Sequence, residues 1–230
     1  MKGLVLNKIK YKDALDIVYL YTDVKGRKTC LLNRKNKSGR IYPLSIIEFE
    51  TNGKQKAEIQ YIKEYVFSPV LPEISSDIKK SAVAMFIGEF LYKILKEEEL
   101  NYPLFDFVCN SIMMLDLMNE GVANFHLYFM VQLSKYLGFS ILPNIDKCSY
   151  FDIKLCRFAF IKPLHPQFFN PENTEILTNL LEIPADRLKD LKLSGIQRIE
   201  FANKMLDFYS FRFDHNLIMK SIGVIHEIFT

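Results

Sequence analysis

Residues 41–53, IYPLSIIEFETNG, decide the fold of the first part of the chain. The first eleven of them are rich in β-branched and aromatic side chains, which favours a strand, and Pro43 suits the entry of an edge strand. Asn52-Gly53 is a dipeptide strongly favoured in tight hairpin turns. Residues 57–66, AEIQYIKEYV, follow at once. The stretch therefore predicts two strands joined by a hairpin turn.

Three more strands are expected upstream of this hairpin. Residues 3–11, 17–21 and 27–33 are short, apolar and partly alternating. In the returning strand Ile59 and Tyr61 are expected to share a face, with Tyr65 as a further candidate. Five short strands in some seventy residues are typical of a small closed barrel, and the OB-fold is the commonest barrel of this size.

The pattern changes to a helical period after Pro69 and Pro72. Ser75 or Ser76 is expected to cap the first helix. Further helices are predicted over residues 103–118, 122–137, 170–181, 184–191, 194–211 and 217–229. The sequence thus predicts an α+β protein of two domains. Residues 1–72 form a five-stranded OB-fold β-barrel, and residues 73–230 form an all-α helical domain with an irregular segment at about 139–170.

Composition excludes several classes of protein. The 230 residues are 49% hydrophobic and 25% charged, as in an ordinary globular protein. No apolar run reaches the roughly 18 residues that span a bilayer, and the first ten residues are too polar for a signal peptide. Four cysteines do not suggest a disulfide scaffold. We expect a cytoplasmic chain that does not bind membranes.

Charge is distributed unevenly along the chain. Residues 1–72 hold 14 Lys/Arg and 7 Asp/Glu, a net charge of +7, and the remainder carries −4. A basic segment attracts polyanions and binds phosphates without reading sequence. The residues predicted to contact DNA are Lys8, Lys10, Lys12, Lys25, Arg27, Lys28, Arg34, Lys35, Lys37 and Arg40.

Aromatic residues lie among these cations. Tyr11, Tyr19 and Tyr42 are candidates to stack on bases, since barrels of this kind bind nucleic acid through loops and one sheet face. The alternative is that these tyrosines belong to the barrel core and that the basic loop at 33–40 is a solvated hairpin.

No catalytic constellation is evident in the sequence. Glycine-rich nucleotide-binding motifs and Gly-x-Ser-x-Gly are absent, so no catalytic residue and no enzyme activity are predicted. His126 is expected to be a core residue. Cys148 and Cys156 lack the second member of a Cys-x-x-Cys pair, so neither metal nor other cofactor is expected. Cys30 and Cys109 are expected to be small buried apolar groups.

Several segments resemble the RecO family of recombination mediators, and its Bacteroidetes branch in particular. In the first third these are residues 3–6 (GLVL) with Tyr11 and Asp13, residues 17–22 with Gly26-Arg27, and residues 42–50 (YPLSIIEFE), which match the family's QPLSLLELE with Tyr42 in place of Gln. In the helical part they are residues 89–99 (EFLYKILKEEE), 123–126 (ANFH) and 133–139 (LSKYLGF). The similarity covers essentially the whole chain.

The resemblance implies a DNA repair protein of the RecFOR pathway. Such a protein binds single- and double-stranded DNA, anneals complementary strands, interacts with SSB and, together with RecR, helps load RecA; it would be associated with the nucleoid. Many members carry a four-cysteine zinc module after the third helix. This chain lacks both Cys-x-x-Cys pairs, and packing by Phe151, Phe158, Phe160 and Phe168 is expected to replace the metal. The alternative hypothesis is a protein-interaction adaptor whose barrel binds acidic protein segments and has little affinity for DNA.

Overall fold

The computed structural model describes residues 1–12, 14–35, 40–52, 59–96 and 99–229. Packing divides the chain into two units, Met1–Leu117 and Met118–Thr230. The first unit contains β1 (Lys2–Lys12), β2 (Leu15–Thr22), β3 (Gly26–Asn33), β4 (Ile46–Asn52), β5 (Gln60–Phe67), α1 (Pro72–Ser76), α2 (Ile78–Ile94) and α3 (Tyr102–Leu117). The second contains α4 (Val122–Leu133), η1 (Ser134–Tyr136), β6 (Tyr150–Asp152), β7 (Arg157–Ala159), β8 (Phe168–Phe169), α5 (Pro171–Glu182), η2 (Ala185–Asp190), α6 (Gly195–Phe213) and α7 (Ile222–Phe229).

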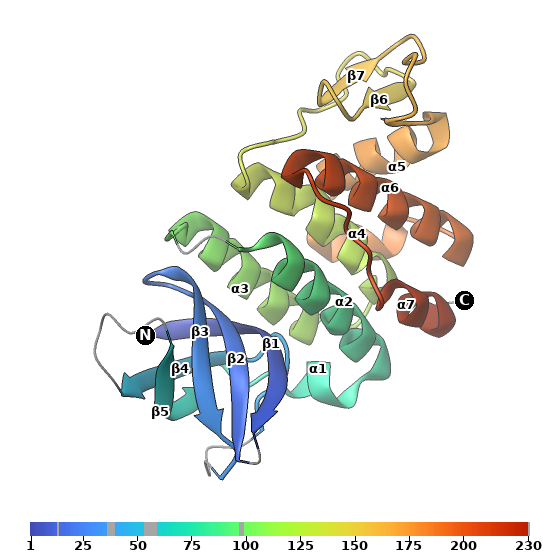
Figure 1. Cartoon of the computed structure of the whole chain (residues 1–230). Coiled ribbons are helices and arrows are strands. Elements are labelled where there is room, and N and C mark those ends of the chain that lie inside the picture. The colour runs from blue at the N-terminus through green and yellow to red at the C-terminus, as the bar shows by residue number, and fades with distance from the viewer. Residues whose placement is uncertain (13, 36–39, 53–58, 97–98, 230) are drawn as a thin grey trace. The chain divides into compact units, whose positions relative to one another are not determined.

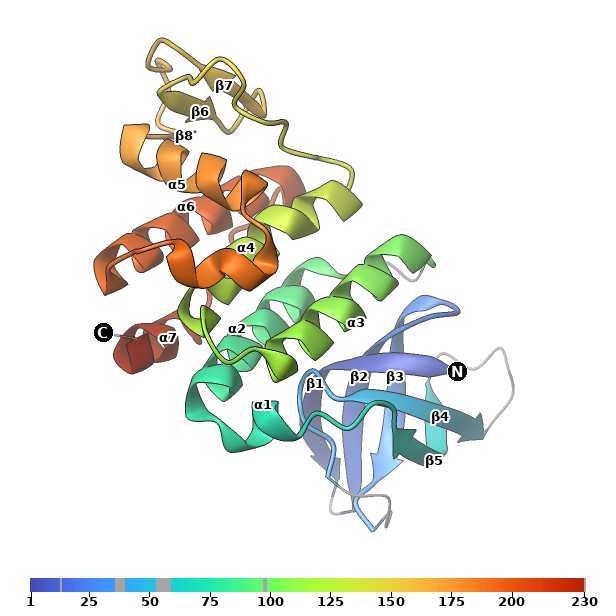
Figure 2. The same cartoon turned by 180° about the vertical axis from the view of Figure 1, so that it is seen from behind.

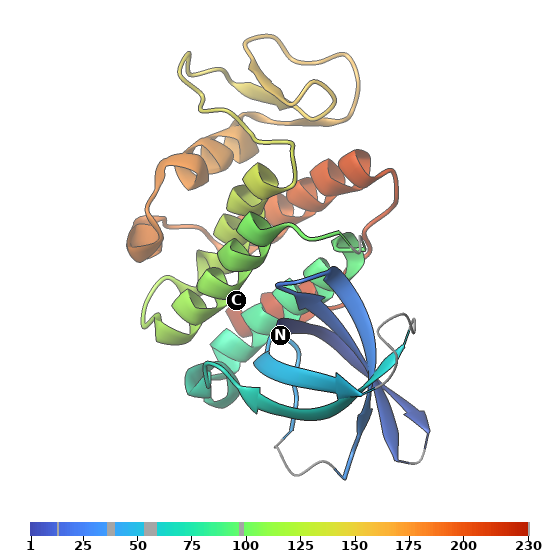
Figure 3. The same cartoon turned by 90° about the vertical axis from the view of Figure 1, so that its left-hand side faces the viewer.

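The first five strands form the expected closed barrel, in the order β1-β2-β3-β5-β4 (Figures 1 and 3). All neighbouring pairs are antiparallel except β3 and β5, which are parallel. Alternating side chains such as Val5, Val18, Cys30 and Ile47 point inward and are fully buried. Because these positions alternate along each strand, burying them closes the sheet around one apolar core.

The strand predicted from residue 41 begins only at Ile46. Residues 42–45 form a turn instead, in which the Ser45 N–H donates to the Tyr42 carbonyl at 3.0 Å and Leu44 has a φ of 66°. Pro43 fixes its own φ and supplies no N–H, so it favours a turn over a ladder position. β4 and β5 then pair antiparallel as expected. Gly53 of the predicted hairpin turn lies outside the described residues.

Ile59 and Tyr61 share a face of the sheet, as predicted, and both are exposed. Tyr65, the further candidate for this face, is instead buried together with Ile62. The pairing with β4 is shifted between Glu50 and Thr51, so the inward positions of the strand do not follow a strict alternation.

The cap of α2 also differs from the prediction. Residues 72–76 form the short helix α1, so neither serine precedes the long helix. Asp77 caps α2 instead, and its carboxylate accepts the N–H groups of Lys79 and Lys80 at 2.7 and 3.0 Å. These hydrogen bonds lower the pKa of the Asp77 carboxyl. α2 and α3 pack in the first unit together with the barrel (Figure 1).

In the second unit the helices lie close to their predicted positions. Asn170 caps α5 as expected and accepts the Asn173 N–H at 2.9 Å, with Pro171 at the first helical position. The segment expected to be irregular contains a three-stranded sheet in the order β7-β6-β8, beside α5 (Figure 2). Within the described residues, no helix combines the length and apolar character that crossing a bilayer requires.

Candidate nucleic-acid interface

One end of the barrel gathers part of the predicted basic set. Lys12 of β1 is paired with Leu15 of β2, and Leu15 is paired with Asn33 of β3. The Arg34 N–H continues this ladder and donates to the Ala14 carbonyl at 2.9 Å. The strand pairing therefore brings Lys10, Lys12 and Lys35 to the same end of the barrel, and all three are exposed. We call Lys10, Tyr11, Lys12 and Lys35 the hairpin end.

The remaining cations of the β2–β3 hairpin lie at the opposite end. Gly26 pairs with Thr22, seven residues along β2 from Leu15, which corresponds to about 23 Å of strand. Lys25 is exposed in this turn. Lys28 is half-buried, and its Nζ donates to Gln60 Oε1 at 2.6 Å. The predicted set is therefore not a single surface.

Arg27 is held by hydrogen bonds and ring contacts within the first unit. Its Nη1 donates to the carbonyls of Tyr92 and Leu95 at 3.0 and 2.8 Å, at the C-terminal end of α2. Its guanidinium also lies over the rings of Tyr19 and Tyr92, 5.3 and 4.7 Å from their centroids. A cation at a helix C-terminus satisfies carbonyls that have no partner within the helix. Arg27 is thus already engaged, and so is Tyr19, which we no longer expect to stack on bases.

Arg34 and Lys8 surround a buried carboxylate. Arg34 Nε lies 2.6 Å from Asp16 Oδ1, and Lys8 Nζ lies 3.9 Å from Asp16 Oδ2. Arg34 Nη2 also donates to the carbonyls of Lys12 and Leu15 at 2.9 and 3.0 Å. Asp16 is only 6% exposed. Arg34 therefore joins the ends of three strands, and its charge is largely balanced by Asp16.

Next to the hairpin end, the outer face of the sheet carries an apolar row. Ile9 pairs with Ile17, Ile17 with Leu31, and Leu31 with Tyr61, so one residue from each of β1, β2, β3 and β5 lies on this face. Tyr61 is 50% exposed, and Ile9 is also exposed. This row gives a polynucleotide an apolar and aromatic surface beside three lysines.

Two exposed tyrosines each have a basic side chain lying over the aromatic ring. Lys12 Nζ lies 5.3 Å from the Tyr11 ring centroid, and the Arg40 guanidinium lies 5.6 Å from that of Tyr42. Tyr11 and Tyr42 are exposed and so do not belong to the barrel core, and their stacking on bases stays a prediction. Lys37 lies outside the described residues.

Sequence reasoning missed the apolar row. Its members come from four strands, and the paired residues of β3 and β5 are thirty positions apart in the chain. Alternation could have suggested Ile9 and Ile17 separately. Their alignment with Leu31 and Tyr61 depends on register, which the local pattern does not specify.

The region in which phenylalanine packing was expected to replace a zinc ion contains a hydrophobic core of its own. Phe151 is fully buried, and its ring lies 5.2, 5.5 and 6.0 Å from those of Phe158, Phe169 and Phe208. Phe168 stacks edge-on against Tyr150 at 5.9 Å. Phe160 is 68% exposed, so its predicted place in this packing was wrong. Phe169 occupies the core because it pairs directly with Phe151 across β6 and β8.

The donor groups of this region do not fit a zinc ion. Cys148 is buried, and Cys156 Sγ contacts the Phe139 carbonyl at 3.9 Å. Asp152 is engaged with His165 Nε2 at 3.2 Å and with the Leu155 N–H at 3.0 Å. Among the described residues no three His, Cys, Asp or Glu side chains converge as metal ligands. A structural zinc site needs four such ligands.

We therefore expect chelation to leave the protein unchanged. Where a structural zinc holds a fold, its removal unfolds the region, because metal binding supplies folding free energy. Here the melting temperature measured by circular dichroism should be the same with and without EDTA. Elemental analysis of the purified chain supplies the control. Stoichiometric zinc, or a melting temperature that EDTA lowers and zinc restores, would contradict the expectation.

The buried titratable groups have the properties of core residues. Burial and the neighbouring Arg198 charge lower the pKa of His126 to about 3, so its ring is neutral at pH 7. Burial raises the pKa of the Cys30 thiol to about 11 and that of the Cys109 thiol to about 12. Neutral thiols are poor nucleophiles, and these three residues are placed as the sequence predicted, within packed elements.

Comparison with known proteins gives a consistent result. Residues 75–217 match the family model described as Recombination protein O C terminal. The chain is 34% identical over 241 residues to the DNA repair protein RecO of Bacteroides fragilis, covering 99% of this chain and 97% of that protein. It is 32% identical to RecO of Phocaeicola vulgatus, covering 99% and 98%. It is 29% identical to RecO of Flavobacterium johnsoniae, covering 100% and 98%.

Proposed function

The chain belongs to the RecO family of DNA repair proteins, and from this premise we propose that it is a recombination mediator that binds DNA without sequence preference. It anneals complementary single strands and, together with RecR, helps to load RecA onto strands coated by SSB. A chain with this role would be found with the nucleoid. The observation that supports DNA binding most directly is the juxtaposition of the hairpin end with the apolar row.

The two parts of this surface suit the two parts of a nucleic acid. Lys10, Lys12 and Lys35 would bind backbone phosphates, which carry no sequence information. Tyr11 and Tyr61 would stack on bases, and stacking tolerates every base because each has a π-face. Such a surface would hold any single strand, whatever its sequence.

Annealing follows from the same electrostatics. Two single strands repel each other through their phosphates, and neutralising part of that charge lets complementary bases come into register. No covalent bond is made or broken, so the proposed activity needs neither a nucleophile nor a cofactor. Specificity would come from base pairing between the strands.

The proposal is tested by charge reversal at the hairpin end. A triple variant, Lys10→Glu, Lys12→Glu and Lys35→Glu, should bind a labelled single-stranded oligonucleotide about 100-fold less tightly near 0.1 M salt, and its salt slope should fall by about 2, because each lost contact to a single strand removes roughly 0.7 from the slope. Fluorescence anisotropy at several salt concentrations measures both quantities. Strand annealing should fall in parallel.

The matched control changes the same charge elsewhere. Lys79→Glu, Lys96→Glu and Lys154→Glu replace three other exposed lysines that are not among the residues predicted to contact DNA. This control should keep most of its affinity and nearly all of its salt slope. Equal losses in the two variants would mean that net charge alone governs binding. Wild-type binding that ignores the hairpin-end lysines and survives high salt would favour the protein-adaptor hypothesis.

A further inference from the structure

The small sheet of the second unit has two faces of different character (Figure 2). One face is a row of three phenylalanines that are paired across the strands, two of which contact rings of α6: Phe158, Phe151 and Phe169. Because side chains alternate along a strand, the next row of paired residues lies on the opposite face. The members of this outer row are Arg157, Asp152 and Phe168. The sheet therefore turns an apolar face to the helices and a mixed face away from them.

The chain between β7 and β8 returns over the outer face. Lys162 Nζ lies 5.5 Å from the centroid of the Phe168 ring, and His165 Nε2 lies 3.2 Å from Asp152 Oδ2. Asp152 is only 5% exposed, and its other carboxylate oxygen accepts a backbone N–H at 3.0 Å. The carboxylate of the outer row is therefore engaged within the chain, whereas Arg157 and Lys162 are exposed.

The charges of Arg157 and Lys162 are not balanced by the protein. In the part of the chain that the structure describes, no carboxylate lies within salt-bridge distance of either side chain. Three other cations of the unit are ion-paired, as Arg187–Asp190, Lys189–Glu120 and Lys204–Asp207. Arg198 and Arg212 donate to backbone carbonyls instead. Cations without such partners remain available to a polyanion.

Exposed apolar side chains lie in the same segment as these cations. Phe160 directly follows the last residue of β7 and is 68% exposed, and the adjacent Ile161 is 83% exposed. Residues 157–162 thus combine two free cations with an aromatic ring between them, as Lys10, Tyr11 and Lys12 do at the hairpin end. A single nucleic-acid strand presents the matching groups, since phosphates and unpaired bases alternate along it.

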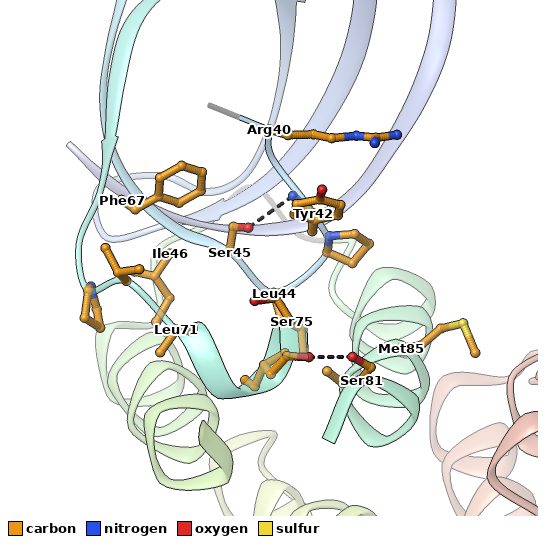
Figure 4. A pocket seen from close by; sticks show the side chains of 15 residues that line it. Arg40, Tyr42, Leu44, Ser45, Ile46, Phe67, Leu71, Ser75, Ser81 and Met85 are labelled. Carbon is orange, nitrogen blue, oxygen red and sulfur yellow. Dashed lines mark hydrogen bonds between the residues drawn. The ribbon is translucent and has the colours of Figure 1, made fainter. Parts of the chain in front are cut away.

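The contact of Lys162 with the Phe168 ring does not consume its charge. A similar pair occurs in the first unit, where the Arg40 guanidinium lies 5.6 Å from the centroid of the Tyr42 ring (Figure 4). In both pairs the ring attracts the cation electrostatically and accepts none of its ordinary hydrogen bonds. The ring therefore holds Lys162 in place while its N–H groups remain for phosphate oxygens.

We propose that the outer face of the small sheet is a second binding site for single-stranded nucleic acid. Arg157 and Lys162 bind backbone phosphates, and a base stacks on the exposed Phe160 ring. We call these three residues the sheet site. The inference rests on the proposed function and deepens it, because annealing brings two strands together and each unit of the chain would hold one. With two cations against three lysines, the sheet site is the weaker of the two.

Cross-linking locates the site directly. A short oligonucleotide that carries 5-iodouracil is irradiated with the full chain, because iodouracil joins covalently to aromatic rings on which it stacks. Mass spectrometry should find the cross-link at Phe160. The cross-link should persist in the Lys10, Lys12 and Lys35 reversal, whose residual binding we assign to the sheet site.

A variant of the sheet site tests its part in annealing. Arg157→Gln, Phe160→Ala and Lys162→Gln remove both charges and the ring at exposed positions, and glutamine avoids a carboxylate directly opposite Asp152. Tight binding of one short oligonucleotide should change by less than about twofold, because the hairpin end supplies more of the phosphate contacts. The second oligonucleotide bound at saturation should be lost, and the annealing rate should fall at least about tenfold, as expected for one stacked base and two phosphate contacts.

The matched control makes the same kinds of change elsewhere in the second unit. Lys154→Gln, Lys192→Gln and Phe211→Ala also replace two exposed lysines and an exposed phenylalanine. Lys154 lies in the turn between β6 and β7, at the end of the sheet away from Phe160. This control should anneal strands like the wild type and should still cross-link at Phe160. Circular dichroism should show that both variants are folded.

Three results would overturn the proposal. The first is the absence of a cross-link at Phe160 in both the wild type and the hairpin-end reversal. The second is equal annealing by the sheet-site variant and its control. The third is binding of phosphatidylglycerol vesicles or polyglutamate at the sheet site when the oligonucleotide does not bind there, which would assign this face to a lipid surface or an acidic protein. If the hairpin-end reversal left DNA binding unchanged, the barrel proposal alone would fail, and the Phe160 cross-link would still decide this one.

Discussion

Replacing Phe151 with alanine is expected to lower the free energy of unfolding of the second unit by about 3–5 kcal/mol, the usual cost of removing a buried phenylalanine. The side chain is fully buried, and its ring contacts Phe158, Phe169 and Phe208. Phe158 and Phe169 belong to the small sheet, and Phe208 belongs to α6. Phe151 therefore joins the sheet to the helices, and alanine would leave a cavity on both sides of that contact.

Urea unfolding followed by circular dichroism measures this effect. Phe160→Ala is the matched control, because Phe160 lies in the same region but is largely exposed, and it should change the free energy by less than about 0.5 kcal/mol. Phe151→Leu should cost less than alanine because it keeps most of the volume. Equal effects of Phe151→Ala and Phe160→Ala would show that the phenylalanine cluster does not hold this region together.

Replacing Arg34 with glutamate is expected to destabilise the first unit by about 2–4 kcal/mol. Removing one partner of a buried ion pair costs about 3–5 kcal/mol, and we reduce this value because the Arg34 side chain is 33% exposed to solvent. The variant would leave the buried Asp16 beside a second negative charge. It would also remove the two hydrogen bonds to the carbonyls of Lys12 and Leu15.

The adjacent Lys35 provides the control. Lys35→Glu makes the same change of charge one residue further along, on an exposed side chain, and should alter stability by less than about 0.5 kcal/mol. The two variants should rank differently in DNA affinity than in stability. At temperatures where both are folded, Lys35→Glu should weaken DNA binding at least as much as Arg34→Glu. Comparable unfolding free energies for the two variants would contradict the structural role of Arg34.

The distinction between these two cations affects any study of DNA binding. Arg34 and Lys35 are neighbours in one basic run, and no local feature of the sequence distinguishes their roles. A variant that reverses both would lose DNA binding partly by damaging the barrel. Using Lys10, Lys12 and Lys35 reduces this problem, because none of the three is within salt-bridge distance of Asp16. Lys10 is paired with Asp16 across β1 and β2, so the unfolding free energy of the triple variant is measured beside its DNA affinity.

Local sequence patterns predicted the elements of the fold well. β-branched and aromatic content, partial alternation and the Asn52-Gly53 dipeptide together predicted all five strands of the barrel, and the change of period after Pro69 marked the start of the helices. Asn170 and Pro171 located the start of α5 to the residue. These features depend on neighbouring residues, whose preferences are the same in any fold. The errors at residues 41–45 and at Ser75 and Ser76 arose where a turn and a one-turn helix competed with the longer pattern.

The sequence by itself determined the barrel, the succession of helices, the basic character of the first third and the likeness to RecO. Only the tertiary structure decided which basic residues are available to a ligand. The partners of Arg27 lie at Tyr92 and Leu95, and that of Arg34 lies at Asp16. Strand register likewise aligned Ile9, Ile17, Leu31 and Tyr61. The physical reason is that ion pairs, helix-end hydrogen bonds and cross-strand rows join residues far apart in the chain, and no local pattern contains both partners.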